Sequence, residues 1–322
     1  MRSNQLSYPA ITSFQKRVQR YNKKLKLPKF LRFFCENNCF LCIFWDIGIY
    51  FVHKISMHRY FLYIFLSILF FSGINQSSIY AKAKNNVPDS LQILYFQVGE
   101  ESFLMKRVEG GVFVMGGTRE QHREPISTDL PTHTVALDAY YIANTEVTQA
   151  LWKTIMPEWE FVEEYYSPSL PISYVNWHDC QEFIRRLDSI TGLQFRLPTE
   201  AEWEFAARGG NNSKGFRFAG SNYIDTVSWS SHNAGFRKHR VGEKLPNELG
   251  LYDMSGNVFE WCQDKYYKYV DTNAENKQTI VTNNRIFRGG SWYYETRGLR
   301  VSFRYYNAPT SVVSDLGFRL AL

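Results

Sequence analysis

Two carboxylates in the last third of the chain, Asp253 and Glu260, have types and spacing that could bind a metal ion. Between them lies the pair Gly256-Asn257, which favours a tight turn. Ca²⁺ takes about six to eight oxygen ligands from carboxylates and carbonyls, and a turn between two carboxylates can supply several of them. The residue types of this segment are therefore compatible with calcium binding. The alternative is a plain turn with both carboxylates in solvent.

The five cysteines do not form a catalytic pattern. Cys35, Cys39 and Cys42 are spaced like part of a zinc site, but a fourth ligand is missing nearby. Cys180 and Cys262 are the only cysteines that follow. In an exported protein they could form a disulfide, and Cys180, on the apolar face of a predicted helix, equally suits a buried free thiol. Both options stay open, since spacing does not show that the two residues are close.

Histidines and glutamates offer no better catalytic candidates. Glu200, Glu202 and Glu204 are close in sequence, but helical spacing puts Glu202 off the face that the other two share, so we interpret them as capping and structural residues. None of the histidines after residue 83 shows the i, i+4 pairing of a zinc-binding helix. They are His122, His133, His178, His232 and His239.

Aromatic residues make up 17% of the chain, and a group of them lies between positions 266 and 306. The group comprises Tyr266, Tyr267, Tyr269, Trp292, Tyr293, Tyr294, Tyr305 and Tyr306. Rigid amphipathic rings suit the recognition of a peptide or a sugar, whereas core packing is the alternative for any single ring. Taken as a set, the rings predict a binding surface.

The formal charge of +6 is distributed unevenly along the chain. Residues 1–56 carry ten Lys or Arg and two acidic residues, whereas the residues after Ala83 carry 25 Lys or Arg and 29 Asp or Glu. The part after Ala83 is therefore mildly acidic. This balance argues against a nucleic-acid-binding protein.

Residues 57–83 have the features of a signal peptide. A short basic start precedes an apolar run, 61–71, that is too short to span a bilayer comfortably. Ala81-Lys82-Ala83 supplies the small residues that precede a cleavage site, so cleavage is expected after Ala83. Residues 1–56 then form a basic N-terminal extension, which is untranslated if the chain starts at Met57. The alternative is an uncleaved membrane anchor.

The rest of the chain divides into a linker, residues 84–104, and one domain, residues 105–322. Strands are predicted at 103–108, 112–115 and 133–142. Helices are predicted at 148–156, at 178–189 and from Thr199, where Thr199 and Glu202 form a capping box. Strands and helices do not alternate as in a parallel α/β protein, so the prediction is an α+β fold with long structured loops.

Seven short motifs follow one another through the predicted domain. They are Val108-Glu-Gly-Gly-Val-Phe-Val-Met-Gly116, Asn144-Thr-Glu-Val-Thr-Gln149, Pro171-Ile-Ser-Tyr-Val-Asn-Trp177, Arg196-Leu-Pro-Thr-Glu-Ala-Glu-Trp-Glu-Phe-Ala-Ala-Arg208, Gly250-Leu-Tyr-Asp-Met-Ser-Gly-Asn-Val-Phe-Glu-Trp261, Arg288-Gly-Gly-Ser-Trp292 and Asp315-Leu-Gly-Phe-Arg319. The series resembles the formylglycine-generating enzyme (sulfatase-modifying factor) family. The resemblance covers about residues 105–322 and implies a C-type-lectin-like fold.

Enzymes of that family oxidise a sulfatase cysteine to formylglycine, with a copper ion held by two cysteines just after the Gly-Gly-Ser motif. Here no cysteine follows Gly289-Gly290-Ser291, and the last cysteine of the chain is Cys262. Soft thiolates suit Cu(I), and oxygen ligands do not replace them well. We therefore expect no copper. The enzyme assignment stays open, but the missing cysteines favour a protein without this activity.

The resemblance also implies the positions of a metal site and of a ligand groove. The family binds a structural Ca²⁺ through side chains that match Asp253 and Glu260 and through backbone carbonyls that match Gly256 and Val258. The residues that flank the family's substrate groove correspond here to Ser291, Trp292, Tyr293, Tyr294, Tyr305 and Tyr306.

A second calcium site of the family would begin at Asn233 and Ala234. Its acidic loop is replaced in this chain by Phe236-Arg-Lys-His-Arg240. This basic stretch would repel a dication, so the prediction of a second calcium site is weaker than that of the first.

The main hypothesis is an exported, non-catalytic binding or scaffolding module, periplasmic or associated with the cell envelope. It would bind a peptide, protein or glycan through the former active-site face. By resemblance to cysteine-less relatives, an envelope complex is a further expected partner. One alternative is a sulfatase-maturation enzyme that converts a substrate cysteine to formylglycine, and another is a membrane-tethered structural protein.

The export hypothesis predicts where the mature protein begins. Amino-terminal sequencing of the protein recovered from its native cell should start at Lys84, since cleavage is expected after Ala83. A first residue of Met1 or Arg2 would contradict a cleaved signal peptide.

Overall fold

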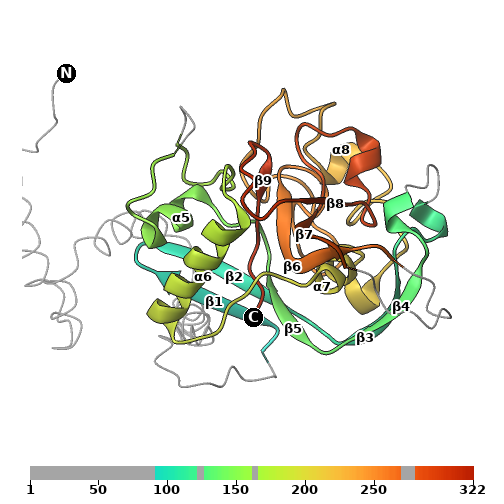
Figure 1. Ribbon diagram of the computed structural model, residues 1–322, viewed down its shortest axis with the longest axis horizontal. Helices are drawn as coiled ribbons and strands as arrows, with labels where there is room; N and C mark the ends of the chain where they lie inside the picture. The colour runs from blue at the N-terminus through green and yellow to red at the C-terminus, as the bar shows by residue number, and fades with distance from the viewer. Residues whose placement is uncertain (1–90, 122–126, 162–165, 270–279) are drawn as a thin grey trace, which may run out of the picture. The chain divides into compact units, whose positions relative to one another are not determined.

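The computed structural model describes residues 91–121, 127–161, 166–269 and 280–322. These ranges all belong to one compact unit, residues 78–322 (Figure 1). The predicted extension 1–56 and signal peptide 57–83 lie outside the described residues. Within the described ranges, no helix combines the length and apolar character that crossing a membrane requires.

The strands form three small sheets. The first joins β1 (Ile93–Val98), β2 (Glu101–Val108) and β5 (Tyr140–Ala143), all antiparallel. The second pairs β3 (Gly111–Met115) with β4 (His133–Leu137). The third has the order β8 (Arg304–Asn307), β7 (Ile280–Arg288), β6 (Phe259–Tyr267) and β9 (Leu316–Gly317), with β9 parallel to β6. Two antiparallel sheets, one mixed sheet and helices that do not alternate with the strands confirm the α+β class.

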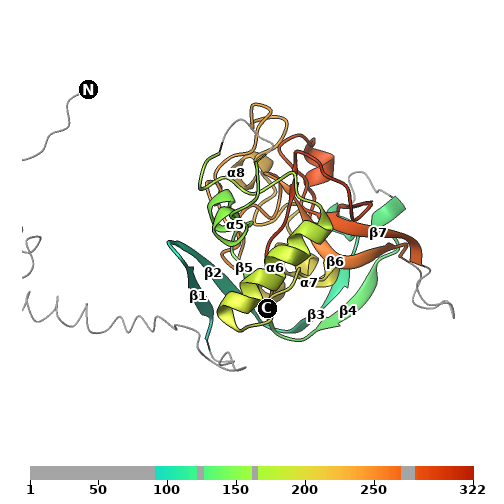
Figure 2. The ribbon, with the colours of Figure 1, turned by 60° about the vertical axis from the view of Figure 1, so that its left-hand side comes forward.

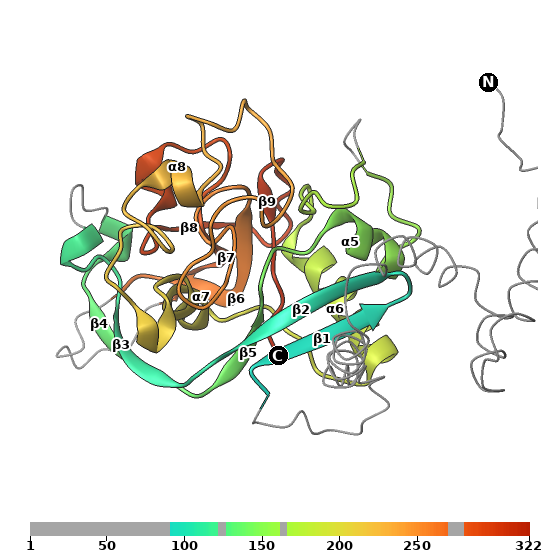
Figure 3. The same cartoon turned by 180° about the vertical axis from the view of Figure 1, so that it is seen from behind.

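The predicted strand 133–142 divides into two. Residues 133–137 form β4 and residues 140–143 form β5, which pair in different sheets. Figure 3 shows the long curved ribbon that results, with β3 and β4 at one end and the β1–β2 pair at the other. The alternating pattern was therefore read correctly as extended chain, but the change of partner between the two halves was not visible in it.

The domain begins earlier than predicted. Residues 93–104, which we assigned to the linker 84–104, form β1 and the start of β2. Leu94, Phe96 and Val98 alternate with less buried neighbours and join the main hydrophobic core. The linker assignment is wrong from Ile93 onward, since this period-2 pattern is that of a half-buried strand.

The three predicted helices are confirmed, and each begins after a side-chain cap. They are α5 (Gln149–Ile155) after Thr148, α6 (Trp177–Thr191) after Asn176 and α7 (Glu200–Ala207) after Thr199. Thr199 Oγ1 accepts from the Glu202 amide at 3.2 Å, and Glu202 Oε2 accepts from the Thr199 amide at 2.8 Å, so the predicted capping box is present.

The remaining helical turns are short. They are α8 (Ile224–Val227) and 3₁₀ turns at Arg119–Gln121, Ser127–Asp129, Gly210–Asn212 and Thr296–Leu299. Helices α5 and α6 pack beside the first sheet, whereas α7 lies against β6 and β7 (Figure 2). Long loops fill the space between these elements, so something other than regular secondary structure must hold them.

Buried arginines hold the loops of the C-terminal half. Arg288, Arg300, Arg304 and Arg319 have exposed fractions of 1% or less. Each forms an ion pair with a buried carboxylate: Arg288 with Glu204, Arg300 with Asp129, Arg304 with Glu200 and Arg319 with Glu260. The partners lie far apart in sequence, so the pairs tie the early helices and loops to the last strands.

Replacing one of these arginines should lower the stability of the domain. Arg319→Met leaves Glu260 buried without its guanidinium partner, and breaking a buried pair in this way costs about 3–5 kcal/mol. We expect a large drop in the midpoint of urea unfolding, measured by circular dichroism. Arg185→Met is the matched control, because Arg185 pairs with Glu182 on the surface and should change the midpoint little. Equal midpoints for the two variants would contradict the role given to Arg319.

Candidate functional site

The predicted calcium segment forms a buried turn that leads into β6. Asp253 and Asn257 have φ values of 58° and 61°, in the left-handed region that few residues other than glycine adopt. Gly256 has a φ of 90°, and a Cβ there would lie 2.2 Å from Ser228 Oγ, so only glycine fits. Val258 is fully buried. The turn is therefore tightly constrained at its centre.

Asp253 lies beside a second buried acid, Glu146, that the sequence reasoning did not single out. Asp253 Oδ2 accepts from the Gly242 amide at 2.7 Å, and Glu146 Oε1 accepts from Asn257 Nδ2 at 3.1 Å. The other oxygen of each carboxyl is buried without a hydrogen-bond partner. Burial raises the pKa of Asp253 to about 6, and burial followed by the charge of Asp253 raises the pKa of Glu146 well above its usual range. Both carboxyls therefore bind a proton more readily than exposed acids do.

Glu260, the second predicted side-chain ligand, is fully engaged by other side chains. Arg319 donates from Nε to Oε2 at 2.5 Å and from Nη2 to Oε1 at 2.6 Å. Trp203 Nε1 also donates to Oε2, at 2.7 Å. A carboxylate that accepts three hydrogen bonds, two of them from a guanidinium, is held as an ion-pair partner.

Asn257 connects the turn to its surroundings. Its Oδ1 accepts from the His239 amide at 2.9 Å, and its carbonyl accepts from the Trp292 amide at 2.8 Å. Its Nδ2 donates to Glu146, so this one buried residue links the acid pair and His239 through its side chain and the predicted groove segment through its backbone carbonyl.

Five of the six predicted groove residues are aromatic, and we call them the aromatic patch. They are Trp292, Tyr293, Tyr294, Tyr305 and Tyr306. Ring centroids are 5.6 Å apart for Trp292 and Tyr293 and 5.8 Å for Tyr305 and Tyr306, and Phe303 bridges Tyr294 and Tyr305 at 6.2 and 6.3 Å. Tyr293 and Tyr305 are 62% and 47% exposed, so the patch reaches solvent.

The other predicted groove residue, Ser291, is fully buried. Its Oγ donates to Asp315 Oδ2 at 2.5 Å. Ser291 therefore fixes the start of the patch segment rather than facing a ligand. Asp315 is the residue that sequence reasoning missed here, although it opens the last motif of the series.

Three further tyrosines of the sequence group serve the interior. Tyr266, Tyr267 and Tyr269 surround the guanidinium of Arg304, whose carbon lies 3.7 Å from the Tyr269 ring centroid. Cation–π contacts of this kind help to hold a desolvated arginine. For these rings, the core-packing interpretation fits better than a binding role, although Tyr266 also touches Tyr306 with ring centroids 3.8 Å apart.

A family model described as the sulfatase-modifying factor enzyme 1-like domain matches residues 99–322. The chain belongs to this family.

Two relatives and one solved structure are similar to this chain. Chaperone protein LppX of Paenibacillus barcinonensis is 28% identical over 236 residues, which cover 58% of this chain and 81% of LppX. Inactive C-alpha-formylglycine-generating enzyme 2 of Bos taurus is 33% identical over 168 residues, 47% of this chain and half of that protein. The structure of Treponema denticola variable protein 1 matches with a TM-score of 0.61 and 29% identity, over 73% of this chain and 99% of that one. These matches confirm the predicted fold.

The two cysteines of this sulfatase-modifying factor domain are remote from solvent. Cys180 and Cys262 are free and fully buried. Burial raises the pKa of both thiols well above the usual range, so both stay protonated near neutral pH. The open choice between a disulfide and buried thiols is thereby decided in favour of buried thiols.

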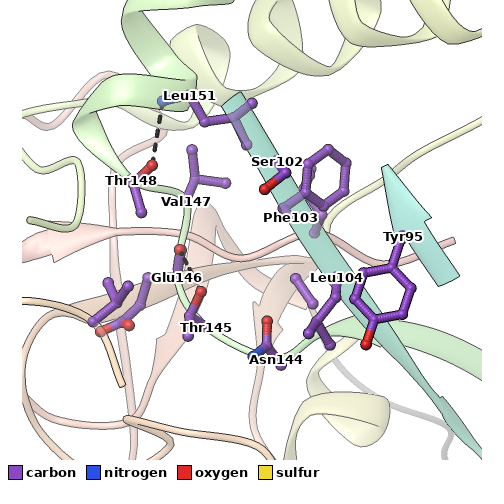
Figure 4. Close-up of a pocket in the computed structure, with 13 residues that line it drawn as sticks. Tyr95, Ser102, Phe103, Leu104, Asn144, Thr145, Glu146, Val147, Thr148 and Leu151 are labelled. Atoms are coloured by element: carbon purple, nitrogen blue, oxygen red, sulfur yellow. Dashed lines mark hydrogen bonds between the residues drawn. The ribbon is translucent and has the colours of Figure 1, made fainter. Parts of the chain in front are cut away.

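A cavity of about 270 Å³ lies between the β1–β2 pair and the segment before α5 (Figure 4). Tyr95, Ser102 and Phe103 lie on one side of it, and Asn144 and Glu146 on the other. The aromatic patch is not part of its lining. The cavity therefore does not correspond to the predicted groove.

The predicted calcium ligands fit the ion in part. Asp253 Oδ1 and Glu146 Oε2 are buried oxygens without a hydrogen-bond partner, as a cation ligand would be. Glu260 does not fit, because Arg319 occupies both of its oxygens. Within the ranges that the structure describes, no three His, Cys, Asp or Glu side chains are grouped as a metal site requires. Calcium at this turn stays a prediction, with Asp253 as its testable ligand.

The calcium prediction can be tested by melting curves. A calcium concentration about 100 times the Kd stabilises a protein by about 2.7 kcal/mol, so Ca²⁺ should raise the Tm of the parent protein above its value in EDTA. Asp253→Ala should abolish this difference. The exposed Asp138→Ala is the control and should keep it. Equal curves for the parent protein in Ca²⁺ and EDTA would show that the turn binds no calcium.

Proposed function

We propose that the protein is a non-catalytic binding or scaffolding module that holds its ligand on the aromatic patch. The observation that carries this proposal is the absence of cysteine after Gly289-Gly290-Ser291. By the resemblance described above, formylglycine-generating enzymes hold copper at this place. The only cysteines between residues 99 and 322, Cys180 and Cys262, are buried and protonated, so they do not supply a thiolate for Cu(I).

The surface beside the missing cysteines supports a binding role. Tyr293 and Tyr305 expose 62% and 47% of their surface, although both pack against other rings. Large rings held by their neighbours lose little conformational freedom on binding, which is why such residues recur as anchors of protein interfaces. A peptide or protein suits this surface, and a glycan is the other ligand class that aromatic rings bind.

The names of two relatives agree with a role without oxidase chemistry. One is called a chaperone protein and the other an inactive formylglycine-generating enzyme. We further propose export to the periplasm or cell envelope, supported by the signal-peptide features of residues 57–83, and an envelope complex as the setting of the ligand.

The test is a search for the family's reaction. The full-length protein is incubated with Cu(I), reductant, oxygen and a cysteine-bearing sulfatase peptide, and the peptide mass is followed. We expect an unchanged cysteine, since no thiolate pair is available for the metal. An active formylglycine-generating enzyme serves as the positive control. Formation of the aldehyde would overturn the proposal and restore the sulfatase-maturation enzyme as the function.

A further inference from the structure

A basic loop, residues 235–240, is linked through Asn257 to the segment that begins the aromatic patch. The His239 ring stacks on Trp229, with centroids 3.7 Å apart and an angle of 10° between the planes. His239 Nε2 lies 2.9 Å from the Ala234 carbonyl. The loop is therefore held by its own aromatic and polar contacts.

The loop and the patch are fixed to the same buried residue. Asn257 accepts from the His239 amide through Oδ1 and from the Trp292 amide through its carbonyl. The chain just before the loop is also tied to the patch, because the Ser231 amide donates to the Tyr294 carbonyl at 3.1 Å. Because these hydrogen bonds are short and partly buried, the loop and the patch keep a fixed relation to each other.

The loop presents charge that the fold does not use. Arg237 and Arg240 are exposed, and neither makes a hydrogen bond or ion pair with the part of the chain that the structure describes. Phe236 is 73% exposed and has a φ of 57°, an outlier for a bulky residue. An exposed ring and two unpaired guanidinium groups on a constrained loop are features that point to function.

The charge of this region contrasts with that of the domain. Residues 229–245 contain four Lys or Arg and one acid, whereas the chain after Ala83 carries 25 Lys or Arg against 29 Asp or Glu. A local positive surface on an acidic domain attracts a short acidic segment, while the rest of the domain repels an extended polyanion such as nucleic acid.

We infer that the basic loop and the aromatic patch form one face that binds an acidic polypeptide segment with apolar anchors. Arg237 and Arg240 pair with its carboxylates, and Phe236, Tyr293 and Tyr305 contact its apolar side chains. Arginine and aromatic residues together are the usual composition of the central contacts in protein interfaces. This inference rests on the proposed binding function and assigns its ligand a charge and a class.

The probe is a phage-displayed library of random twelve-residue peptides, selected on the immobilised full-length protein. We expect selected peptides to be enriched in Asp and Glu and to retain apolar residues. For a synthetic copy of the most enriched peptide, Arg237→Glu/Arg240→Glu should weaken the Kd about tenfold or more, and added salt should weaken it further. Tyr293→Ser/Tyr305→Ser should weaken it as well.

Lys153→Glu/Lys214→Glu is the matched control, since it makes the same change in net charge at exposed positions outside the loop and the patch. It should leave the Kd unchanged. This control also accounts for the basic residues before Ala83, which all variants share. Circular dichroism melting shows whether each variant is folded.

Each other outcome has a distinct meaning. Peptides that depend on Tyr293 and Tyr305 but show no acidic enrichment would overturn this inference and leave the proposed function standing. Acidic peptides that depend on the arginines but not on the tyrosines would overturn the joint face. A heparin oligosaccharide that displaces the peptide and binds more tightly through the same arginines would replace the polypeptide with an anionic glycan. A library without enriched peptides would overturn both the inference and a peptide-binding function.

Discussion

The fold depends on four guanidinium groups that are almost completely shielded from water. Burying an arginine is costly unless its charge is paired, and here each of the four has a buried acid as its partner. The acids come from the segment 127–129, from α7 and from β6, whereas the arginines come from residues 288–319. The strands and helices are too short to fix the long loops. Buried ion pairs, which require a specific geometry, fix them instead.

Because these ion pairs join distant parts of the sequence, only the local features of the site could be predicted. The motif series identified the fold, and the spacing of Thr199 and Glu202 identified a helix start, since caps are local. The sequence also shows that no cysteine follows Gly289-Gly290-Ser291, where the family has its copper ligands. By contrast, Glu260 pairs with Arg319, 59 positions away in the sequence, and a local sequence pattern cannot predict such a partner. Glu146 was missed for the same reason.

Strands were the weakest part of the prediction. Phe259 to Cys262 in β6 are all buried, so this part of the strand lacks the alternation that marks a half-exposed strand. β1 shows clear alternation, but the polar residues that precede it suggested a linker. The change of sheet between β4 and β5 depends on which strands pair, and pairing is a property of the whole chain.

Asn257 gives the site its coherence. This buried residue bonds to Glu146 and His239 through its side-chain amide and to Trp292 through its backbone carbonyl, so none of these three segments can move far without breaking a hydrogen bond. A change of charge at Glu146 or Asp253 therefore acts at the base of the exposed face. The turn of residues 253–260 and the backbone that carries Trp292 are therefore mechanically coupled.

The position of Arg319 has a consequence for the order in which contacts form during folding. Residues 319–322 insert between early parts of the chain: Ala321 pairs with Ile142 and Arg196, and the Ala143 amide donates to the Leu320 carbonyl at 2.8 Å. Contacts between positions so far apart in sequence must close a long loop before they stabilise the fold, so they are expected to form later in folding than the local helices and hairpins. The pairing of Arg319 with Glu260 therefore belongs to the late, non-local part of folding.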